Sequence, residues 1–145
     1  MVLGYEELTE PERAVWDAIE TGTLVDLRVG TPEGDDPAHG ESWGTERMVR
    51  SQLLNELLTN LTAPKDAHLR GLRLAGARIT GLLDMEAARL ACPLRLEGCR
   101  VDEPVNLARA SCDGSVSFDG SIFAANVSFL EARFRQRVSL NGALF

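Results

Sequence analysis

The sequence predicts a mainly β protein, in which a parallel β-solenoid follows an α-helical cap. Two observations predict this architecture. From Leu72 to Phe145 the apolar residues recur at steps that alternate between five and six, so the pattern repeats every eleven residues. Residues 1–66 lack this repeat and contain two segments with the apolar spacing of amphipathic helices.

The eleven-residue repeat is clearest where its units begin with valine, as in VSFDGSIFAAN from Val116 and VSFLEARFRQR from Val127. Each unit has two apolar centres, and a second small or apolar residue stands two positions before each centre. The centres are Leu74, Ile79, Met85, Leu90, Leu96, Val101, Leu107, Cys112, Phe118, Phe123, Phe129, Phe134, Leu140 and Phe145.

Short strands separated by corners explain these steps. The steps match neither the 3.6-residue period of a helix nor the two-residue period of one long strand. Residues two apart on a strand point to the same side, so each centre and its partner face inward while the residue between them faces outward. The outward positions hold Arg73, Arg78, Asp84, Arg89, Arg95, Arg100, Asn106 and Arg133.

The repeat resembles a known family. Its pattern, A-x-[LF]-x-x, resembles the pentapeptide repeat, and VSFDGSIFAAN is similar to the five-plus-six variant with an FxGAxF-type core. The resemblance implies a right-handed, four-sided parallel β-helix over residues 67–145, with about 22 residues per turn. It also implies that Phe118, Phe123, Phe129, Phe134 and Leu140 face inward.

The first 66 residues are expected to cap the solenoid. Thr9 and Glu12 fit a capping box at the start of a helix that ends at Gly22, and Leu24 to Leu27 fit a short strand. A polar loop over residues 30–44 follows. A second helix is expected from about Thr45, with an apolar stripe of Val49, Leu53, Leu54, Leu57, Leu58 and Leu61, and an end at Pro64. Together the two helices would cover the first open coil.

A second resemblance concerns the junction of these segments. DDPAHGESWGTERMVRSQLL, followed by LRLAGARITGLLD, is similar to the start of long bacterial proteins, some of which carry membrane segments further along. An N-terminal fragment of a larger membrane-associated protein is therefore one alternative. Within this chain no apolar run approaches the ~18 residues of a membrane span, and the start MVLGYEELTE does not resemble a secretory signal. These features favour a cytoplasmic location.

Charge is divided unevenly along the chain. The net charge is −7. Residues 1–71 hold 14 acidic and 6 basic residues, whereas residues 72–145 hold 8 acidic and 9 basic residues. A DNA-mimicking protein that binds a topoisomerase needs a strongly acidic solenoid to imitate phosphates. The nearly neutral solenoid makes DNA mimicry the weaker alternative to a non-enzymatic scaffold that binds a protein partner, and no direct nucleic-acid binding is expected.

A search for chemical sites yields one weak candidate. Asp35, Asp36, His39 and Glu41 could supply carboxylate and imidazole ligands to a metal, but their spacing matches no calcium loop and favours a solvated acidic loop. The chain has no nucleophile elbow and no phosphate-binding glycine loop. We therefore expect no catalytic residue, no cofactor and no enzymatic activity. Cys92, Cys99 and Cys112 fit neither a zinc site nor a disulfide framework and are expected in the core.

Two surfaces are candidates for binding. Arginines 22 residues apart should stack, which pairs Arg73 with Arg95 and Arg78 with Arg100. These ladders form either a groove for a phosphate or an acidic partner, or simply a solvated face. At the other end, Phe134, Leu140 and Phe145 would lie on an open last coil, and exposed strand edges of this kind favour a homodimer through that coil.

Overall fold

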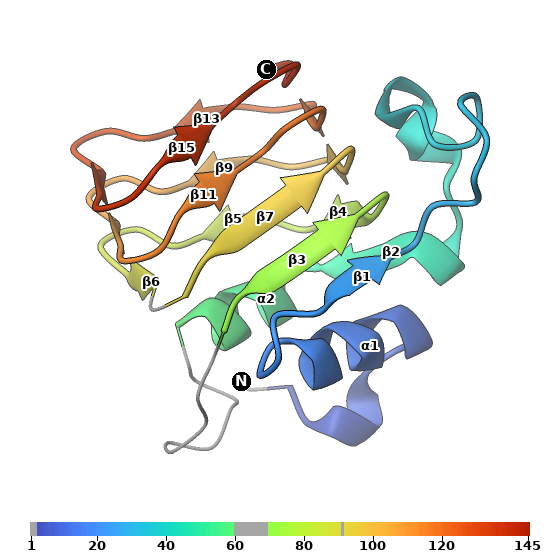
Figure 1. Ribbon diagram of the computed structural model, residues 1–145, viewed down its shortest axis with the longest axis horizontal. Coiled ribbons are helices and arrows are strands. Elements are labelled where there is room, and N and C mark those ends of the chain that lie inside the picture. The colour runs from blue at the N-terminus through green and yellow to red at the C-terminus, as the bar shows by residue number, and fades with distance from the viewer. Residues whose placement is uncertain (1–2, 60–69, 91) are drawn as a thin grey trace.

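The computed structural model describes residues 3–59, 70–90 and 92–145, and it forms a parallel β-solenoid of about three turns with helices at its N-terminal end (Figure 1). This confirms the predicted fold class. The right-handed, four-sided form of the coil stays a prediction. The boundary expected between residues 66 and 67, and the helix end expected at Pro64, lie outside the described residues.

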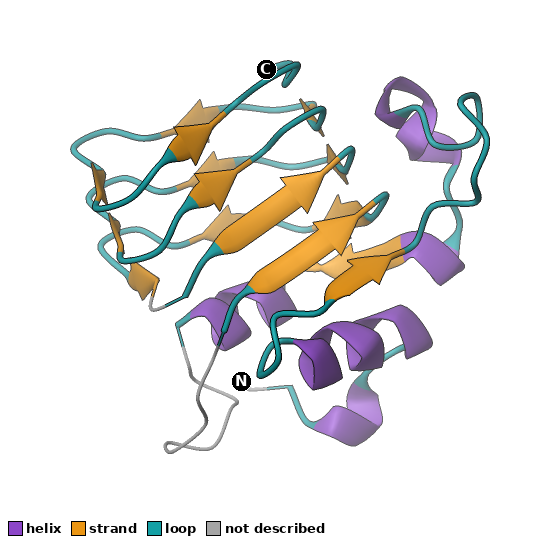
Figure 2. Ribbon diagram, in the orientation of Figure 1, coloured by secondary structure: helices purple, strands orange, loops and turns teal. Residues whose placement is uncertain are grey.

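Helices and strands alternate in the N-terminal part, and only strands follow (Figure 2). The first part contains η1 (Tyr5–Glu7), α1 (Glu10–Ala18), β1 (Leu24–Asp26), η2 (Pro37–Ser42), η3 (Thr45–Arg47), β2 (Met48–Arg50) and α2 (Ser51–Leu58). The solenoid strands are β3 (Leu72–Ala75), β4 (Arg78–Thr80), β5 (Leu83–Asp84), β6 (Arg89–Leu90), β7 (Leu94–Glu97), β8 (Arg100–Val101), β9 (Val105–Asn106), β10 (Ser111–Cys112), β11 (Val116–Ser117), β12 (Ile122–Phe123), β13 (Val127–Ser128), β14 (Arg133–Phe134) and β15 (Val138–Ser139).

The described strands stack into four parallel sheets. Sheet A has the order β1-β3-β7-β11-β15, sheet B β2-β4-β8-β12, sheet C β5-β9-β13 and sheet D β6-β10-β14. Within the repeats, paired residues are 22 positions apart, as in Leu83 with Val105 and Val116 with Val138. Each coil therefore consists of two eleven-residue units, as the repeat predicts.

The predicted inward residues form the core in the first coils but only partly in the last one. Phe118 is 1% exposed and Phe123 4%. Phe129 and Phe134 are only half-buried, and Leu140 is 40% exposed. These side chains are less buried because β13, β14 and β15 each pair with a neighbouring strand on one side only, as expected for residues on an open last coil.

Each unit turns its first corner through a left-handed residue. The residue two positions after the first centre has a positive φ. In the units centred on Met85, Leu107, Phe118, Phe129 and Leu140, the next amide also donates back to the centre, as from Ala88 N to Met85 O at 3.1 Å. This matches a type II turn, in which the third residue needs φ > 0. These residues are Gly76, Ala87, Gly98, Arg109, Gly120, Glu131 and Gly142. The glycines recur every 22 residues and so mark one corner of every coil.

The solenoid extends into the N-terminal segment. β1 pairs in parallel with β3 and β2 with β4, so residues 24–50 form a partial coil below the first repeat. The predicted helix start at Thr45 is wrong, because Val49 lies in β2 opposite Ile79 and is fully buried there. Pairing with the open edge of β4 satisfies backbone groups of residues 48–50, which outweighs their helical pattern.

The helices fill the space under this coil. The Thr9 hydroxyl accepts from Glu12 N at 3.4 Å, and the Glu12 carboxylate accepts from Thr9 N at 3.1 Å, which confirms the capping box of α1. α2 packs against β5 and β2, and its four leucines are buried, namely Leu53, Leu54, Leu57 and Leu58. None of the helices described here is long and apolar enough to cross a membrane.

Candidate interaction surfaces

The four arginines predicted to form ladders divide between two sheets. Arg73 on β3 pairs in register with Arg95 on β7, on sheet A. Arg78 on β4 pairs with Arg100 on β8, on sheet B. Adjacent parallel strands are about 4.8 Å apart, so each pair brings two guanidinium groups onto one face. The two ladders differ in what surrounds them.

The ladder on sheet B is neutralised within the fold. Asp102 accepts from Arg78 Nε at 2.8 Å and from Arg100 Nε at 3.1 Å, so one carboxylate bridges both arginines. The side chains of Arg78 and Arg100 are only 22% and 14% exposed. Ion pairs that are part-buried and share hydrogen bonds lose less to solvent screening than surface pairs do.

The loop between β1 and β2 covers the same ladder. Arg100 donates to Pro37 O at 3.3 Å and lies 3.4 Å from the Glu41 carboxylate, and Arg78 donates to Trp43 O at 3.4 Å. A Cβ at Gly40 would lie 2.8 Å from Arg100 Cβ, so only glycine allows this approach. We call residues 31–47 the clasp, because they leave the coil after β1 and fold back onto sheet B.

A buried arginine holds the clasp together. The Arg47 guanidinium lies 3.6 Å from the centre of the Trp43 ring, donates to Gly76 O at 2.8 Å and pairs with Asp35 at 3.2 Å. Burial opposes the charged form of Asp35, but amide hydrogen bonds from Val29 and Gly30 and the nearby Arg47 hold the pKa of Asp35 below its usual value. Sequence reasoning missed Arg47 and Trp43, although a tryptophan in a polar loop was a usable signal.

The weak metal candidate does not assemble in this loop. Asp36 accepts from Ala38 N at 2.9 Å, while Asp35 faces Arg47 and Glu41 faces Arg100. His39 Nδ1 lies 3.9 Å from the Asp36 carboxylate. Within residues 3–59, 70–90 and 92–145, no group of three or more His, Cys, Asp or Glu side chains could hold a metal ion.

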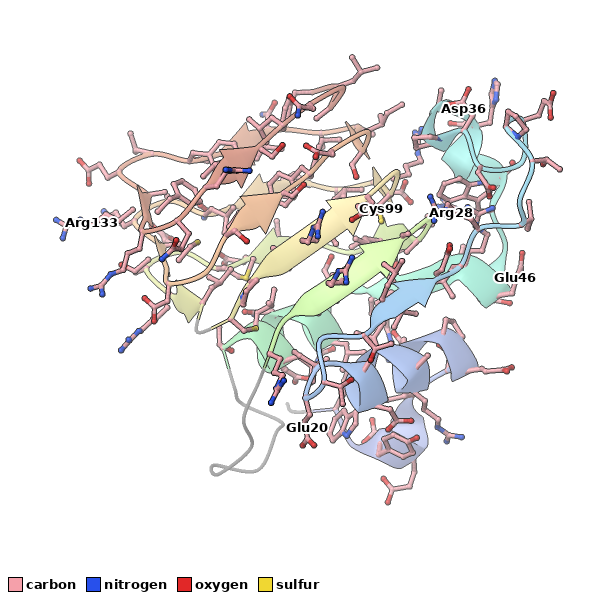
Figure 3. The ribbon with its side chains drawn as sticks, in the orientation of Figure 1. Glu20, Arg28, Asp36, Glu46, Cys99 and Arg133 are labelled. Atoms are coloured by element: carbon pink, nitrogen blue, oxygen red, sulfur yellow. The ribbon has the colours of Figure 1, made fainter. Side chains whose placement is uncertain are left out.

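Sheet A carries the open ladder. Arg95 lies 3.3 Å from Glu97, whereas Arg73 has no ion pair among the described residues, and its buried Nε has no hydrogen-bond partner. Side chains tipped with nitrogen lie in front of β3 and β7, and no part of the clasp crosses them (Figure 3). Beside the ladder, a groove of about 770 Å³ is lined by polar residues that include Arg95, Ser117, Gln136, Arg137, Ser139 and Asn141.

A comparison with known families decides the identity of this segment. Residues 96–144 match the family described as pentapeptide repeats (9 copies). The matched segment, residues 96–144, is a pentapeptide-repeat solenoid. The coil that begins at β3 has the same register and precedes the matched residues. No curated protein and no solved structure matches the chain.

Sheets C and D form the rest of the pentapeptide-repeat surface. On sheet D, Arg89 pairs with Asp113 at 2.8 Å, and at the corner between sheets C and D Arg109 pairs with Glu86. Arg133 points away from the solenoid beside this sheet and forms no ion pair with a described residue (Figure 3). On sheet C the outward column is short and polar, and Asn106 Oδ1 accepts from Ala108 N at 3.0 Å to shape the corner.

The cysteines lie inside the pentapeptide-repeat coil. Burial raises the pKa of the Cys99 thiol to about 12 and that of Cys92 to about 11, and burial also raises the pKa of Cys112. Above Cys99, the Ser121 hydroxyl accepts from Cys99 N at 3.0 Å and donates to Leu96 O at 2.8 Å. The three thiols are free and unreactive at neutral pH.

The last coil exposes part of its apolar interior. Phe145 stacks on Phe123 with ring centres 5.0 Å apart, yet Phe145 is 61% exposed and Leu140 40%. Phe134 is half-buried. A small groove of about 330 Å³ lies between Phe129, Leu140 and Phe145. The homodimer expected through these residues stays a prediction.

Proposed function

We propose that the chain is a non-enzymatic interaction module, a rigid solenoid that binds a protein partner through an outer face. The observation that carries this proposal is that one arginine ladder is covered by the fold and the other is exposed. The clasp and Asp102 cover the ladder on sheet B, whereas sheet A leaves its ladder open beside a polar groove. A surface that is ordered, polar and uncovered is suited to recognition.

The chemistry of the described side chains supports a binding role. The carboxylates with lowered pKa values are held by hydrogen bonds or ion pairs that fix the fold, as Glu12 is by Arg50 and Asp119 by Ser139. Catalytic carboxylates usually have environments that raise the pKa toward neutrality. The solenoid therefore offers positioned donors and acceptors for a partner rather than a proton-transfer pair.

DNA mimicry is a weaker candidate for this surface. A mimic has to present rows of unpaired acidic groups that replace phosphates. Here Glu86 pairs with Arg109, Asp113 with Arg89 and Asp102 with two arginines. We expect no inhibition of gyrase supercoiling, and inhibition lost on Asp84→Asn with Glu86→Gln would favour mimicry. A larger membrane-associated protein would be compatible with the same binding role.

Site-specific cross-linking tests the proposal. Because the native thiols are buried, a single cysteine introduced at Ser115, Ala124, Asn126 or Arg133 can be labelled selectively with a benzophenone maleimide. Ser115, Ala124 and Asn126 stand next to strands of sheets A, B and C, and Arg133 is on sheet D. In extracts of the source organism we expect one defined protein adduct from one face and none from the others. Folded variants that give no adduct from any face would contradict an interaction module.

A further inference from the structure

We propose that sheet A binds an extended acidic segment of the protein partner, with its carboxylates on the Arg73–Arg95 ladder and on Arg137. This inference rests on the proposed function and names the face and the chemistry of the partner. It does not depend on a homodimer through the last coil or on the clasp.

Unpaired positive charge on sheet A is the first observation. Among the described residues, neither Arg73 nor Arg137 forms an ion pair, and Arg73 also has a buried Nε without a hydrogen-bond acceptor. An arginine without a counter-ion keeps unused donors on its guanidinium group, and a carboxylate is the acceptor that matches this planar fork best. Arg95 adds a third guanidinium, held at 3.3 Å from Glu97.

The acids on this face are already engaged, which is the second observation. Asp119 accepts from the Ser139 hydroxyl at 2.6 Å and from Asn141 N at 2.9 Å, and the Ser139 hydrogen bond holds the pKa of Asp119 below its usual value. Asp113, at the border of the groove, pairs with Arg89. The face therefore has spare donors rather than spare acceptors, which fits an anionic ligand.

The spacing suits an extended chain. Arg73, Arg95 and Arg137 lie on or next to β3, β7 and β15, and β11 stands between the last two strands. At about 4.8 Å per strand the row spans roughly 14 Å, which is the length of four or five extended residues. Alternate residues of such a segment point to one side, so two or three acidic side chains can reach the arginines.

Charge favours a protein ligand over a nucleic acid. Proteins that hold nucleic acid usually present a strongly basic surface, and their affinity grows with each phosphate neutralised. This chain has a net charge of −7, and its N-terminal part is acidic. A long phosphate backbone would extend past sheet A and meet the acidic N-terminal part, whereas an acidic peptide of four or five residues stays within the local field of sheet A.

Fluorescence anisotropy with the full chain tests the inference. The probe is a fluorescein-labelled peptide of four Glu-Ser repeats, with a Lys-Ser peptide and an eight-residue oligothymidylate for comparison. We expect the acidic peptide to bind at low ionic strength and to bind roughly fivefold or more weakly to Arg73→Gln and to Arg137→Gln. Arg133→Gln removes the same charge from an exposed arginine on sheet D and should leave the affinity unchanged.

Three results would overturn the inference. They are failure of the acidic peptide to bind, an equal loss of affinity in Arg133→Gln, and tighter binding of the oligothymidylate. Circular dichroism melting of each variant shows whether a loss reflects unfolding, and Arg137→Gln keeps the test valid if Arg73→Gln does not fold. A defined cross-linked adduct without peptide binding would leave the interaction module standing and remove only its acidic partner.

Discussion

The Arg100 guanidinium lies 3.4 Å from the Glu41 carboxylate, across 59 residues of chain. This contact joins the clasp to sheet B of the solenoid, next to the bridge that Asp102 makes between Arg100 and Arg78. The N-terminal segment is therefore built into the coil at its side as well as beneath it. One arginine ladder becomes a docking surface for the chain itself, and the other stays open.

Replacing Gly40 by alanine should release the clasp. The new Cβ would lie 2.8 Å from both Cβ and Cδ of Arg100. Because Arg100 Cβ is attached to the backbone of β8, it can move away only if the strand moves too. In a Trp16→Phe background, Trp43 fluorescence should shift to the red as the ring leaves its buried site. Glu33→Ala, at an exposed position of the same loop, is the control. An unchanged spectrum for Gly40→Ala would mean that the clasp does not depend on this approach.

The left-handed corners predict opposite effects of two substitutions. Gly98 has φ 56° and nothing within 4 Å of an added Cβ, so Gly98→Ala isolates the backbone effect and should cost about 1 kcal/mol of stability. Ala87 has φ 57°, so Ala87→Gly should leave the stability unchanged or raise it by up to about 1 kcal/mol. Urea titration measures both. A loss of stability for Ala87→Gly would contradict the corner geometry.

Core substitutions should follow burial along the coil. Phe118 is 1% exposed and packs against Phe123 and Phe129, so Phe118→Ala should cost about 3–5 kcal/mol. Phe129 is only half-buried, and Phe129→Ala should cost clearly less. If chemical denaturation shows that the two variants lose the same free energy of unfolding, Phe129 must be as fully buried as Phe118.

We expect the Glu12 carboxylate to make the stability of the fold depend on pH, with a loss of stability in acid. Burial disfavours its charged form, but hydrogen bonds from Arg50 and from Thr9 N hold the pKa of Glu12 below its ordinary value of 4.5. A group with a depressed folded pKa stabilises the fold above the unfolded pKa, and this contribution is lost as pH falls through the folded value. Glu12→Gln should therefore be less stable near pH 7 and lose less on acidification below 4.5. Parallel urea midpoints for both proteins from about pH 7 to about pH 3 would argue against this linkage.

The coil could be predicted from sequence because its signal is local and repeated. The pairs Leu74–Ile79 and Phe118–Phe123 follow one rule, and every unit adds evidence for the same register. The corner residues carry a second periodic signal, since Gly76, Gly98, Gly120 and Gly142 are 22 residues apart. Ala87 and Arg109 carry the same conformation without glycine, and nothing in their identity indicates it.

The clasp could not be predicted because it depends on pairing between distant segments. Val49 fits an apolar helical stripe, and only the open edge of β4 places it in a strand. Arg78 and Arg100 look equivalent to Arg73 and Arg95 in sequence, and their different roles depend on Asp102 and on the path of residues 31–47. Ion pairs of this kind follow from the tertiary fold rather than from a spacing rule.

Titration of the isotopically labelled chain with the acidic Glu-Ser peptide, followed by amide NMR, tests the central claim most directly. The claim is that sheet A is the face that binds an acidic segment of the partner. It predicts shift changes concentrated in β3, β7, β11 and β15, with the residues of sheet C and the clasp unchanged. Changes centred on sheet C or on the clasp, or no changes at any peptide concentration, would contradict it.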